Sequence, residues 1–369
     1  MKKYIFAVIL CAAVLAGISG CNARRDISLG FLGILTGKLG DLGISGRDGA
    51  VLAVELINEN GGIEGRKIHL LIENNELDPQ ICREKASILI DQDIQGLIGP
   101  MTSDMSLACK ELFDNARIVM ISPTASTPLL SDQDDYFLRV NPSDESEGIE
   151  LAKYAADVLN VQKIAVVYDT LNESFTYGVY SKFAEALMKI KEVSIKAYTF
   201  LSSDKIDFLD LSDSVLSGKP DAVFIVASAL DTGTLCQRLR NKDAEVAIMA
   251  TGWAMTEELI KQGGRAVDGV VFNHYHNNNS SVPAYKEFVA GFRHRFGSNP
   301  DFIAALSFNA VNVWAQAYST RKKNQDVKAR VIEIGIFNGL QGEVRINEYG
   351  DAFLERHYIS VKDGVFIDL

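Results

Sequence analysis

Cysteine and histidine are scarce in this sequence, and their scarcity excludes several classes of protein. Five cysteines in 369 residues are too few for a scaffold held together by disulfide bonds. No Cys-x-x-Cys pair or Cys/His spacing typical of a metal site occurs. None of the five histidines stands in a Gly-x-Ser-x-Gly or His-Glu-x-x-His motif. We therefore expect a protein without metal, cofactor or catalytic activity.

Two patterns among these residues leave alternatives open. Cys82 and Cys109 fall in successive predicted helices and could form a disulfide, although small buried thiols are the favoured interpretation. His274 and His276 lie two residues apart, which could indicate a metal site. The asparagines that follow them and the lack of nearby acidic residues favour a polar connection instead.

An excess of positive charge is also lacking. The chain has 37 lysines and arginines against 48 acidic residues, which gives a net charge of −11. A surface this negative repels a phosphate backbone, so we expect no binding to nucleic acid. Apolar residues make up 47% and charged residues 23%, as in an ordinary soluble globular protein, and the length predicts two domains.

The N-terminus carries the one long apolar run, which predicts a secretion signal. Lys2 and Lys3 precede an apolar stretch over 4–17 that is short for a membrane-spanning helix, and a small residue then precedes Cys21. This order resembles the signal of bacterial lipoproteins, in which the cysteine is lipidated and becomes the first mature residue. We expect residues 1–20 to be removed and Cys21 to anchor the protein on the periplasmic or extracellular face of a membrane. An ordinary signal peptide or a signal anchor is the alternative.

The rest of the chain alternates predicted strands and helices, which is typical of an open parallel sheet with helices on both faces. Apolar periodicity and flanking cap residues define these elements. In the first half we expect strands at 27–35, 67–73, 94–98 and 118–121, and helices at 47–60, from Pro79, and at 105–115.

The same alternation repeats in the second half, so we predict two doubly wound units with a crossing at 139–144. The end of the chain, over 342–369, has the turn signals of hairpins. The other expected elements are strands at 163–168, 193–199, 222–226, 246–249 and 269–272, and helices at 175–189, 206–216, 231–241, 282–296, 302–320 and from 325.

Ligands of such folds bind beyond the carboxyl ends of the strands, so the turns after the strands are candidate binding segments. The first of these turns, over 36–43, is rich in glycine but is not a phosphate-binding loop. Gly33 and Gly37 are one residue too close for that motif, and Leu39 replaces its hydroxyl residue. We expect either a flexible connection or a loop whose Leu42 contacts the apolar part of a ligand.

Two further turns carry hydroxyl groups that could hold a carboxylate. Thr102 and Ser103 open a helix, where free N–H groups and the helix dipole favour an anion, although such residues often only cap the helix. Thr124, Ala125 and Ser126 lie between two prolines, just after a buried strand. Because the sheet does not need their backbone groups, this segment is either a second part of the carboxylate site or a plain polar loop.

Equivalent turns in the second half offer aromatic and acidic residues. Phe175 follows the strand that ends at 168, and Trp253 follows the strand that ends at 249. Trp253 suggests an apolar or aromatic ligand body. Asp231 begins a predicted helix, where it is either the N-cap residue or the partner of a ligand ammonium group.

The order of these segments resembles that of the branched-chain amino-acid-binding proteins of ABC transporters, the leucine/isoleucine/valine type. The similarity extends from Ile27 to Leu369. It rests on Thr36-Gly37, Leu42-Gly43, Gly49, the run Asn58-x-x-Gly-Gly-Ile-x-Gly, Asp78-Pro79, Ile98-Gly99, Ser122-Pro123 and Gly350-Asp351.

The resemblance implies the α/β fold of a type I periplasmic binding protein, with two doubly wound parallel-sheet lobes joined by a three-crossing hinge. Lobe 1 is then expected over 21–143 and 273–341, and lobe 2 over 144–272 and 342–369. The resemblance also implies a monomer that captures a small ligand by hinge closure and delivers it to ABC permease subunits. It would touch the membrane through its lipid anchor alone.

The resemblance further implies roles for individual residues. Ser103 corresponds to a hydroxyl that holds the ligand carboxylate, and Thr124 to a backbone contact. Ser126 corresponds to the hydroxyl that bridges the carboxylate and the amino group. Phe175 falls where a tyrosine closes over the ligand, and a second tyrosine position falls near Ser228.

The sequence departs from the family pattern at Gly252, where the family has an acid that neutralises the ligand ammonium group. A buried ammonium group without a carboxylate costs on the order of several kcal/mol. Either Asp231 takes over this role, or the ligand has no amino group. We therefore expect an aliphatic or aromatic amino acid, with the corresponding carboxylic acid without an amino group as the alternative. A ligand-sensing receptor that uses the same clamp is a further possibility.

Overall fold

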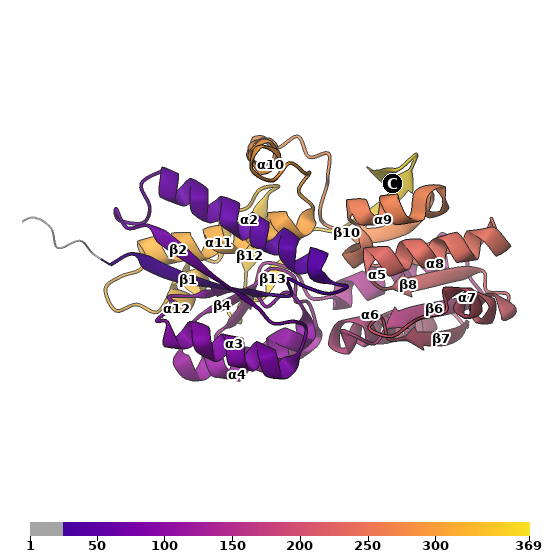
Figure 1. Ribbon diagram of the computed structural model, residues 1–369. Helices are drawn as coiled ribbons and strands as arrows, with labels where there is room; N and C mark the ends of the chain where they lie inside the picture. Colours follow the sequence, from indigo (N-terminus) through magenta and orange to yellow (C-terminus); the bar gives the residue numbers. More distant parts are fainter. Residues whose placement is uncertain (1–24) are drawn as a thin grey trace, which may run out of the picture.

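The computed structural model describes residues 25–369, which form two lobes lying side by side (Figure 1). Each lobe combines segments from distant parts of the chain, as the colours of Figure 1 show: the orange helices near 300–330 join the indigo N-terminal part, and the yellow C-terminal end joins the middle of the chain. The predicted signal segment and Cys21 lie outside the described residues. Within those residues, no helix is long and apolar enough to cross a membrane.

Lobe 1 is built on five parallel strands in the order β2-β1-β3-β4-β5, which confirms the doubly wound fold. Helices α2 and α11 pack on one face of this sheet, and α3 and α4 pack on the other. The strands are β1 (Ile27–Gly33), β2 (Ile68–Asn74), β3 (Leu97–Ile98), β4 (Met120–Ser122) and β5 (Phe137–Arg139). The helices are α2 (Gly40–Glu59), α3 (Pro79–Asp91), α4 (Ser103–Ala116), α10 (Pro283–Phe296), α11 (Phe302–Thr320) and α12 (Val327–Ile334).

Lobe 2 is built on the sheet β15-β14-β10-β9-β8-β6-β7, whose strands β6 to β10 run parallel. An antiparallel hairpin of β14 and β15 extends this sheet at β10. Helices α5 and α6 cover one face, and α7, α8 and α9 cover the other. The strands are β6 (Lys163–Asp169), β7 (Ser194–Phe200), β8 (Ala222–Val226), β9 (Ala247–Ala250), β10 (Val271–His274), β14 (His357–Lys362) and β15 (Val365–Asp368). The helices are α5 (Glu145–Asp157), α6 (Glu173–Ile190), α7 (Phe208–Ser217), α8 (Ala229–Lys242) and α9 (Glu257–Gly263).

The third crossing between the lobes lies later in the chain than the expected boundary at 341–342. A small sheet of β11 (Ile336–Asn338), β12 (Glu343–Ile346) and β13 (Ala352–Phe353) contributes its buried side chains to the core of lobe 1. Because β14 already pairs with β10 in lobe 2, the crossing occupies residues 354–356. The turn signals over 342–369 correctly predict hairpins. They do not show that β12 and β13 belong to lobe 1 while β14 and β15 belong to lobe 2.

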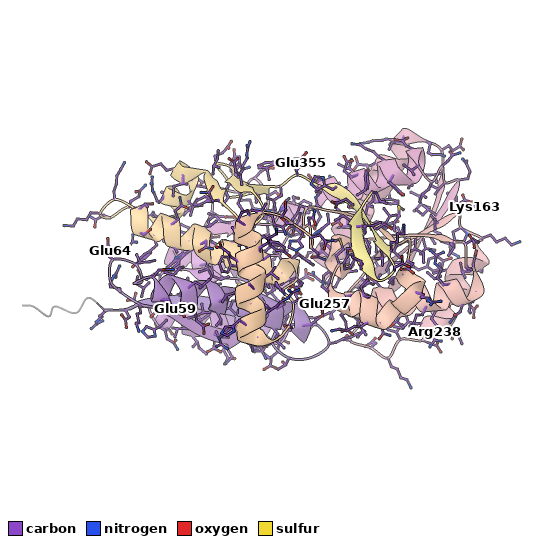
Figure 2. All side chains as sticks on the ribbon, turned by 90° about the horizontal axis from the view of Figure 1, so that it is seen from above. Glu59, Glu64, Lys163, Arg238, Glu257 and Glu355 are labelled. Carbon is purple, nitrogen blue, oxygen red and sulfur yellow. The ribbon has the colours of Figure 1, made fainter. Side chains whose placement is uncertain are left out.

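Figure 2 shows where this crossing lies. Glu355 is at the middle of the molecule, between the lobe that carries Glu59 and Glu64 and the lobe that carries Lys163 and Arg238. The first crossing, between β5 and α5, spans residues 140–144, as the polar segment at 139–144 predicted.

Helix α2 begins at Gly40 and not at Arg47 as predicted, so the second half of the glycine-rich turn over 36–43 is helical and not a flexible loop. Glycine is a poor helix former, which is why the pattern suggested a loop. The helix is stabilised by packing that only glycine permits: a Cβ atom at Gly43 would lie 1.7 Å from the carbonyl oxygen of Ile34. This close approach brings Leu42 to the carboxyl end of β1.

Other local signals are confirmed. The carboxylate of Asp78 accepts hydrogen bonds from the first backbone N–H groups of α3, and Pro79 is its first residue. Gly61 and Gly62 follow α2 with positive φ angles of 97° and 69°. Helices α5 and α9, by contrast, have no counterpart among the predicted elements.

The described cysteines and the histidine pair at 274 and 276 are buried. Cys82, Cys109 and Cys236 are free and buried thiols in the part of the chain that the structure describes. The Nε2 atom of His276 lies 3.2 Å from the hydroxyl oxygen of Tyr285, which supports a polar connection. Across residues 25–369, no three His, Cys, Asp or Glu residues are grouped so as to hold a metal ion.

Candidate functional site

A cavity lies between the two lobes, at the carboxyl ends of the strands. In lobe 1 it adjoins β1 and β3, between which the strand order reverses, and this is where open α/β sheets bind their ligands. The structure brings six of the sequence-predicted site residues to the wall of this cavity: Leu42, Ser103, Thr124, Ser126, Phe175 and Trp253.

Hydroxyl groups at the start of α4 form the lobe 1 wall. Ser103 is the first residue of α4, and its Oγ atom accepts hydrogen bonds from the N–H groups of Ser126 and Thr127, both at 3.3 Å. Ser103 and Ser126 are therefore neighbours, and both are almost fully buried. The partial positive charge at the N-terminus of α4 makes this wall attractive to an anion.

The segment after β4 is held firmly in place. The hydroxyl of Thr124 donates a hydrogen bond to the carbonyl oxygen of Met101. The side-chain amide of Asn141 donates one to the carbonyl oxygen of Thr124 at 3.0 Å. Because Asn141 lies in the first crossing, the hydroxyl-bearing segment and the hinge are directly connected.

Aromatic side chains form much of the lobe 2 wall. Phe175 lies in the first turn of α6, and Trp253 lies in a short 3-10 turn after β9. Their rings meet edge to face, with 5.6 Å between centroids and an interplanar angle of 86°. Such a pair offers a rigid apolar surface to a ligand.

Three predicted site residues do not line the cavity among the described residues. Thr102 is buried directly before α4, and the N–H group of Ala125 donates to the Oγ atom of Ser122 at 3.0 Å. Asp231 is buried at the start of α8, where its Oδ1 atom lies 2.7 Å from the Nζ atom of Lys38. The structure thus gives Asp231 a partner from lobe 1 in place of a ligand ammonium group.

The ion pair of Lys38 and Asp231 connects the two lobes. Lys38 lies in the turn after β1, and its Nζ atom also donates to the carbonyl oxygen of Ser202 at 3.2 Å. A second contact between the lobes joins the N–H group of Asp104 to the Oδ1 atom of Asn172 at 3.3 Å. Both contacts require the lobes to be as close together as they are here.

We expect Asp231→Asn to weaken ligand binding about fivefold, because a partly buried ion pair that exists only between closed lobes contributes about 1 kcal/mol to closure. The affinity of the wild type should also fall more steeply with salt than that of the variant. Titration calorimetry at low and high salt measures both effects. Glu185→Gln is the matched control, since its ion pair with Lys189 lies within α6. Equal affinities of Asp231→Asn and wild type would contradict this role.

Sequence reasoning missed the charged residues of the cavity, which are Asp144, Glu147 and Arg356. Asp144 is the last residue of the first crossing, Glu147 belongs to the unpredicted helix α5, and Arg356 belongs to the third crossing. Only Asp144 lay in a segment that the sequence singled out. The crossings between the lobes meet at the cavity, so charged residues in the crossings are the sequence feature that could have indicated Asp144 and Arg356.

Burial dominates the electrostatics of these groups. The pKa of Asp144 is raised to about 8 by burial, which outweighs its hydrogen bond with Ser126. Burial also raises the pKa of Glu147, whose Oε2 atom lies 3.7 Å from the guanidinium group of Arg356. The pKa of His274 is held well below its usual value by burial, so this cavity residue is uncharged at neutral pH.

The backbone at Gly252 explains why no acid can occupy that position in this chain. Its N–H group donates to the Oε1 atom of Glu147 at 2.6 Å. A Cβ atom at Gly252 would lie 2.1 Å from the Cδ2 atom of His274. A carboxylate is therefore already beside Gly252, but α5 supplies it.

Comparisons with known proteins agree with the fold. The family model described as "Periplasmic binding protein" matches residues 26–358. The chain is 25% identical to the Leu/Ile/Val-binding protein homolog 1 of Brucella abortus over 359 residues, which cover 96% of this chain and 94% of that protein.

Two solved structures are similar in fold. The branched-chain amino acid transporter substrate-binding protein LivJ of Streptococcus pneumoniae, in complex with isoleucine, has a TM-score of 0.85 at 22% identity, over 94% of this chain and 99% of that one. A solute-binding protein of an ABC transporter from R. palustris, in complex with benzoate, has a TM-score of 0.83 at 18% identity, over 93% and 95%.

Proposed function

The chain belongs to the periplasmic binding protein family, and we propose that it captures a small carboxylate ligand between its lobes for an ABC transporter. A member of this family is a solute-binding protein and not an enzyme. The observation that carries the proposal is the pair of adjacent, buried hydroxyl residues Ser103 and Ser126 at the N-terminus of α4.

The ligand carboxylate would bind first to lobe 1. The hydroxyl groups of Ser103 and Ser126 and free N–H groups of lobe 1 are the donors, with Thr124 as a backbone contact. Hydrogen bonds to a charged group contribute roughly 1.5–3 kcal/mol each. Since these groups are buried, little water competes for the carboxylate.

Closure of the hinge would then bring Phe175 and Trp253 over the rest of the ligand and exclude water. The ligand favours the closed state because it contacts both lobes only there. The ion pair of Lys38 and Asp231 adds a direct contact between the lobes in that state. A permease that recognises the closed shape would thereby receive loaded protein.

The anchor and the partners follow from the sequence. We propose that Cys21 carries the lipid, so that the folded body works on the periplasmic or extracellular face of the membrane as a monomer. ABC permease subunits are the proposed partners.

Two ligand classes fit this site. Names and complexes of similar proteins include amino acids, such as isoleucine, and benzoate, an acid without an amino group. The apolar surface of Phe175 and Trp253 suits the body of either class. Native mass spectrometry of protein purified without refolding identifies a bound ligand directly, and a thermal-shift screen of amino acids and their deaminated acids compares the classes.

We expect Ser126→Ala to weaken binding of the best ligand at least about tenfold, because it removes a hydrogen bond to the carboxylate. Titration calorimetry measures the change. Ser87→Ala is the control, since Ser87 is exposed on α3 and bonds only to the carbonyl oxygen of Arg83 within the described structure. Unchanged affinity in Ser126→Ala would overturn the assignment of the carboxylate site.

A further inference from the structure

We infer that Asp144 is the acid that binds an ammonium group of the ligand, so that the ligand is a zwitterionic amino acid and not its deaminated counterpart. This inference rests on the proposed function and names the ligand class of the same site. The inference gives the first crossing the role of neutralising the ligand ammonium group, because Gly252 has no carboxylate and Asp231 is paired with Lys38.

The carboxylate of Asp144 is available for a ligand. Asp144 lines the cavity and is 2% exposed. It occupies the N-cap position of α5, but its side chain accepts no hydrogen bond from the helix in the described structure. Its Oδ2 atom has no hydrogen-bond partner among the described residues. A buried carboxylate oxygen without a partner is costly, so a cationic partner would be strongly stabilising.

The position of Asp144 suits an α-amino acid. Its N–H group donates to the carbonyl oxygen of Ser126 at 3.0 Å, and its carboxylate is hydrogen-bonded with the Ser126 side chain. Ser126 in turn adjoins Ser103, where the ligand carboxylate would bind. A single carbon separates the two charged groups of an α-amino acid, so these neighbouring groups can hold both of them.

A second acceptor lies in the same crossing. The Oδ1 atom of Asn141 is buried and unpartnered within residues 25–369, and Asn141 also lines the cavity. Its amide orientation is fixed, because its nitrogen donates to Thr124. An ammonium group has three N–H donors, so Asn141 and Asp144 together can satisfy two of them.

The other charged groups around Asp144 already have partners. Glu147 accepts from Gly252 and lies beside Arg356, which also donates to the carbonyl oxygen of Asn273 at 3.0 Å. Arg139 is paired with Asp351 at 2.6 Å.

His274 is uncharged, and burial keeps Tyr275 protonated by raising its pKa. Arg356 and Arg139 act on Asp144 only through space, so Asp144 is the acid that forms no direct ion pair among the cavity-lining residues that the structure describes.

The test compares Asp144→Asn with wild type by titration calorimetry, using leucine and phenylalanine and their deaminated acids, 4-methylpentanoate and 3-phenylpropanoate. We expect wild type to bind one amino acid at least tenfold more tightly than its deaminated acid. Asp144→Asn should lose at least thirtyfold in affinity for that amino acid and change less than threefold for the acid, since a charge-assisted bond is removed only for the ammonium group. Glu145→Gln is the control, because Glu145 pairs with Lys182 outside the cavity.

The pH dependence gives a second readout. The pKa of about 8 in the free protein means that Asp144 must release a proton to hold an ammonium group. The affinity for the amino acid should therefore rise from pH 6 to pH 8, by up to about tenfold per pH unit, and Asp144→Asn should abolish this rise. A ligand without an amino group would bind more weakly as Asp144 ionises over the same range.

The variant should fold. In the wild type, folding raises the pKa of Asp144 from its ordinary value of 3.8 to about 8, so the stability that Asp144 contributes falls as the pH rises between these two values. Asparagine removes that cost, so the unfolding temperature of Asp144→Asn at pH 7.5 should equal or exceed that of wild type.

Two failures can be told apart. Tight binding of a deaminated acid and none of its amino acid, or an amino-acid affinity that is the same in Asp144→Asn and wild type, overturns this inference but leaves the carboxylate clamp intact. If none of the twenty amino acids and none of their deaminated acids binds to the wild type, the proposed function is wrong, and this inference is then wrong as well.

Discussion

Gly252→Ala is expected to weaken ligand binding on the order of a hundredfold. The added Cβ atom would lie 2.1 Å from the Cδ2 atom of His274, and that ring is itself packed 4.1 Å from the ring of Tyr275, so neither neighbour can move freely. Forcing a methyl group into such a site costs about 1–3 kcal/mol. Because Trp253 follows directly and Glu147 bonds to the same N–H group, the strain falls on two residues of the lobe 2 wall of the cavity.

Gly252→Asp should bind no better than Gly252→Ala, even though it introduces an acid at the position where the family resemblance implies one. The new carboxylate would lie close to Glu147, and like charges in a buried site repel. Titration calorimetry of both variants with the best ligand measures the losses. The control is the double variant Gly252→Ala with His274→Ala, in which removal of the ring should recover part of the affinity of the single glycine variant. Tighter amino-acid binding by Gly252→Asp would show that the site tolerates an acid there.

Gly49→Ala is expected to destabilise lobe 1 by about 2–3 kcal/mol. A Cβ atom at Gly49 would lie 2.1 Å from the carbonyl oxygen of Ala304 and 2.8 Å from its Cα atom. The obstacle is backbone, so α2 and α11 would have to move apart. This overpacking outweighs the gain of up to about 1 kcal/mol that alanine gives over glycine inside a helix.

Thermal unfolding of the free protein measures this effect, and the chain offers a matched control. Gly291 lies inside α10, and a Cβ atom there would lie no closer than 3.9 Å to Leu52. Gly291→Ala should therefore leave the unfolding temperature unchanged or raise it slightly. Equal unfolding temperatures for Gly49→Ala and wild type would mean that the contact between the two helices is less tight than described.

Elements that local sequence patterns specify were predicted well, whereas elements that depend on tertiary packing were not. Strands such as β8 and helices such as α11 were predicted with their observed bounds, because their apolar patterns are long and their ends are marked by cap and turn residues. The start of α2 was wrong, since tertiary packing there overrides the weak helix propensity of Gly40 and Gly43. Local patterns contain no information about a neighbour such as Ile34.

The candidate site shows the same division. Hydroxyl and aromatic residues in strand-to-helix turns were found, since the fold class alone predicts that these turns face the ligand. Asp144, Glu147 and Arg356 were not found, because they lie in the crossings or on a helix that gave no clear pattern. For Asp231 the sequence left open an N-cap role and a contact with a ligand ammonium group, and in the structure its carboxylate pairs with Lys38. The pairing of acidic with basic side chains depends on how the two lobes pack together, which local sequence patterns do not show.

The interleaving of the two lobes has a consequence for biosynthesis. The sheet of lobe 1 is covered by α11, which follows all of the parallel strands of lobe 2, and the sheet of lobe 2 receives β14 and β15 only after α11 and α12. Contacts between segments so distant in sequence form slowly. A nascent chain leaving the ribosome therefore cannot complete one lobe before it begins the other. Both lobes therefore stay incomplete until the segments near the C-terminus have been synthesised.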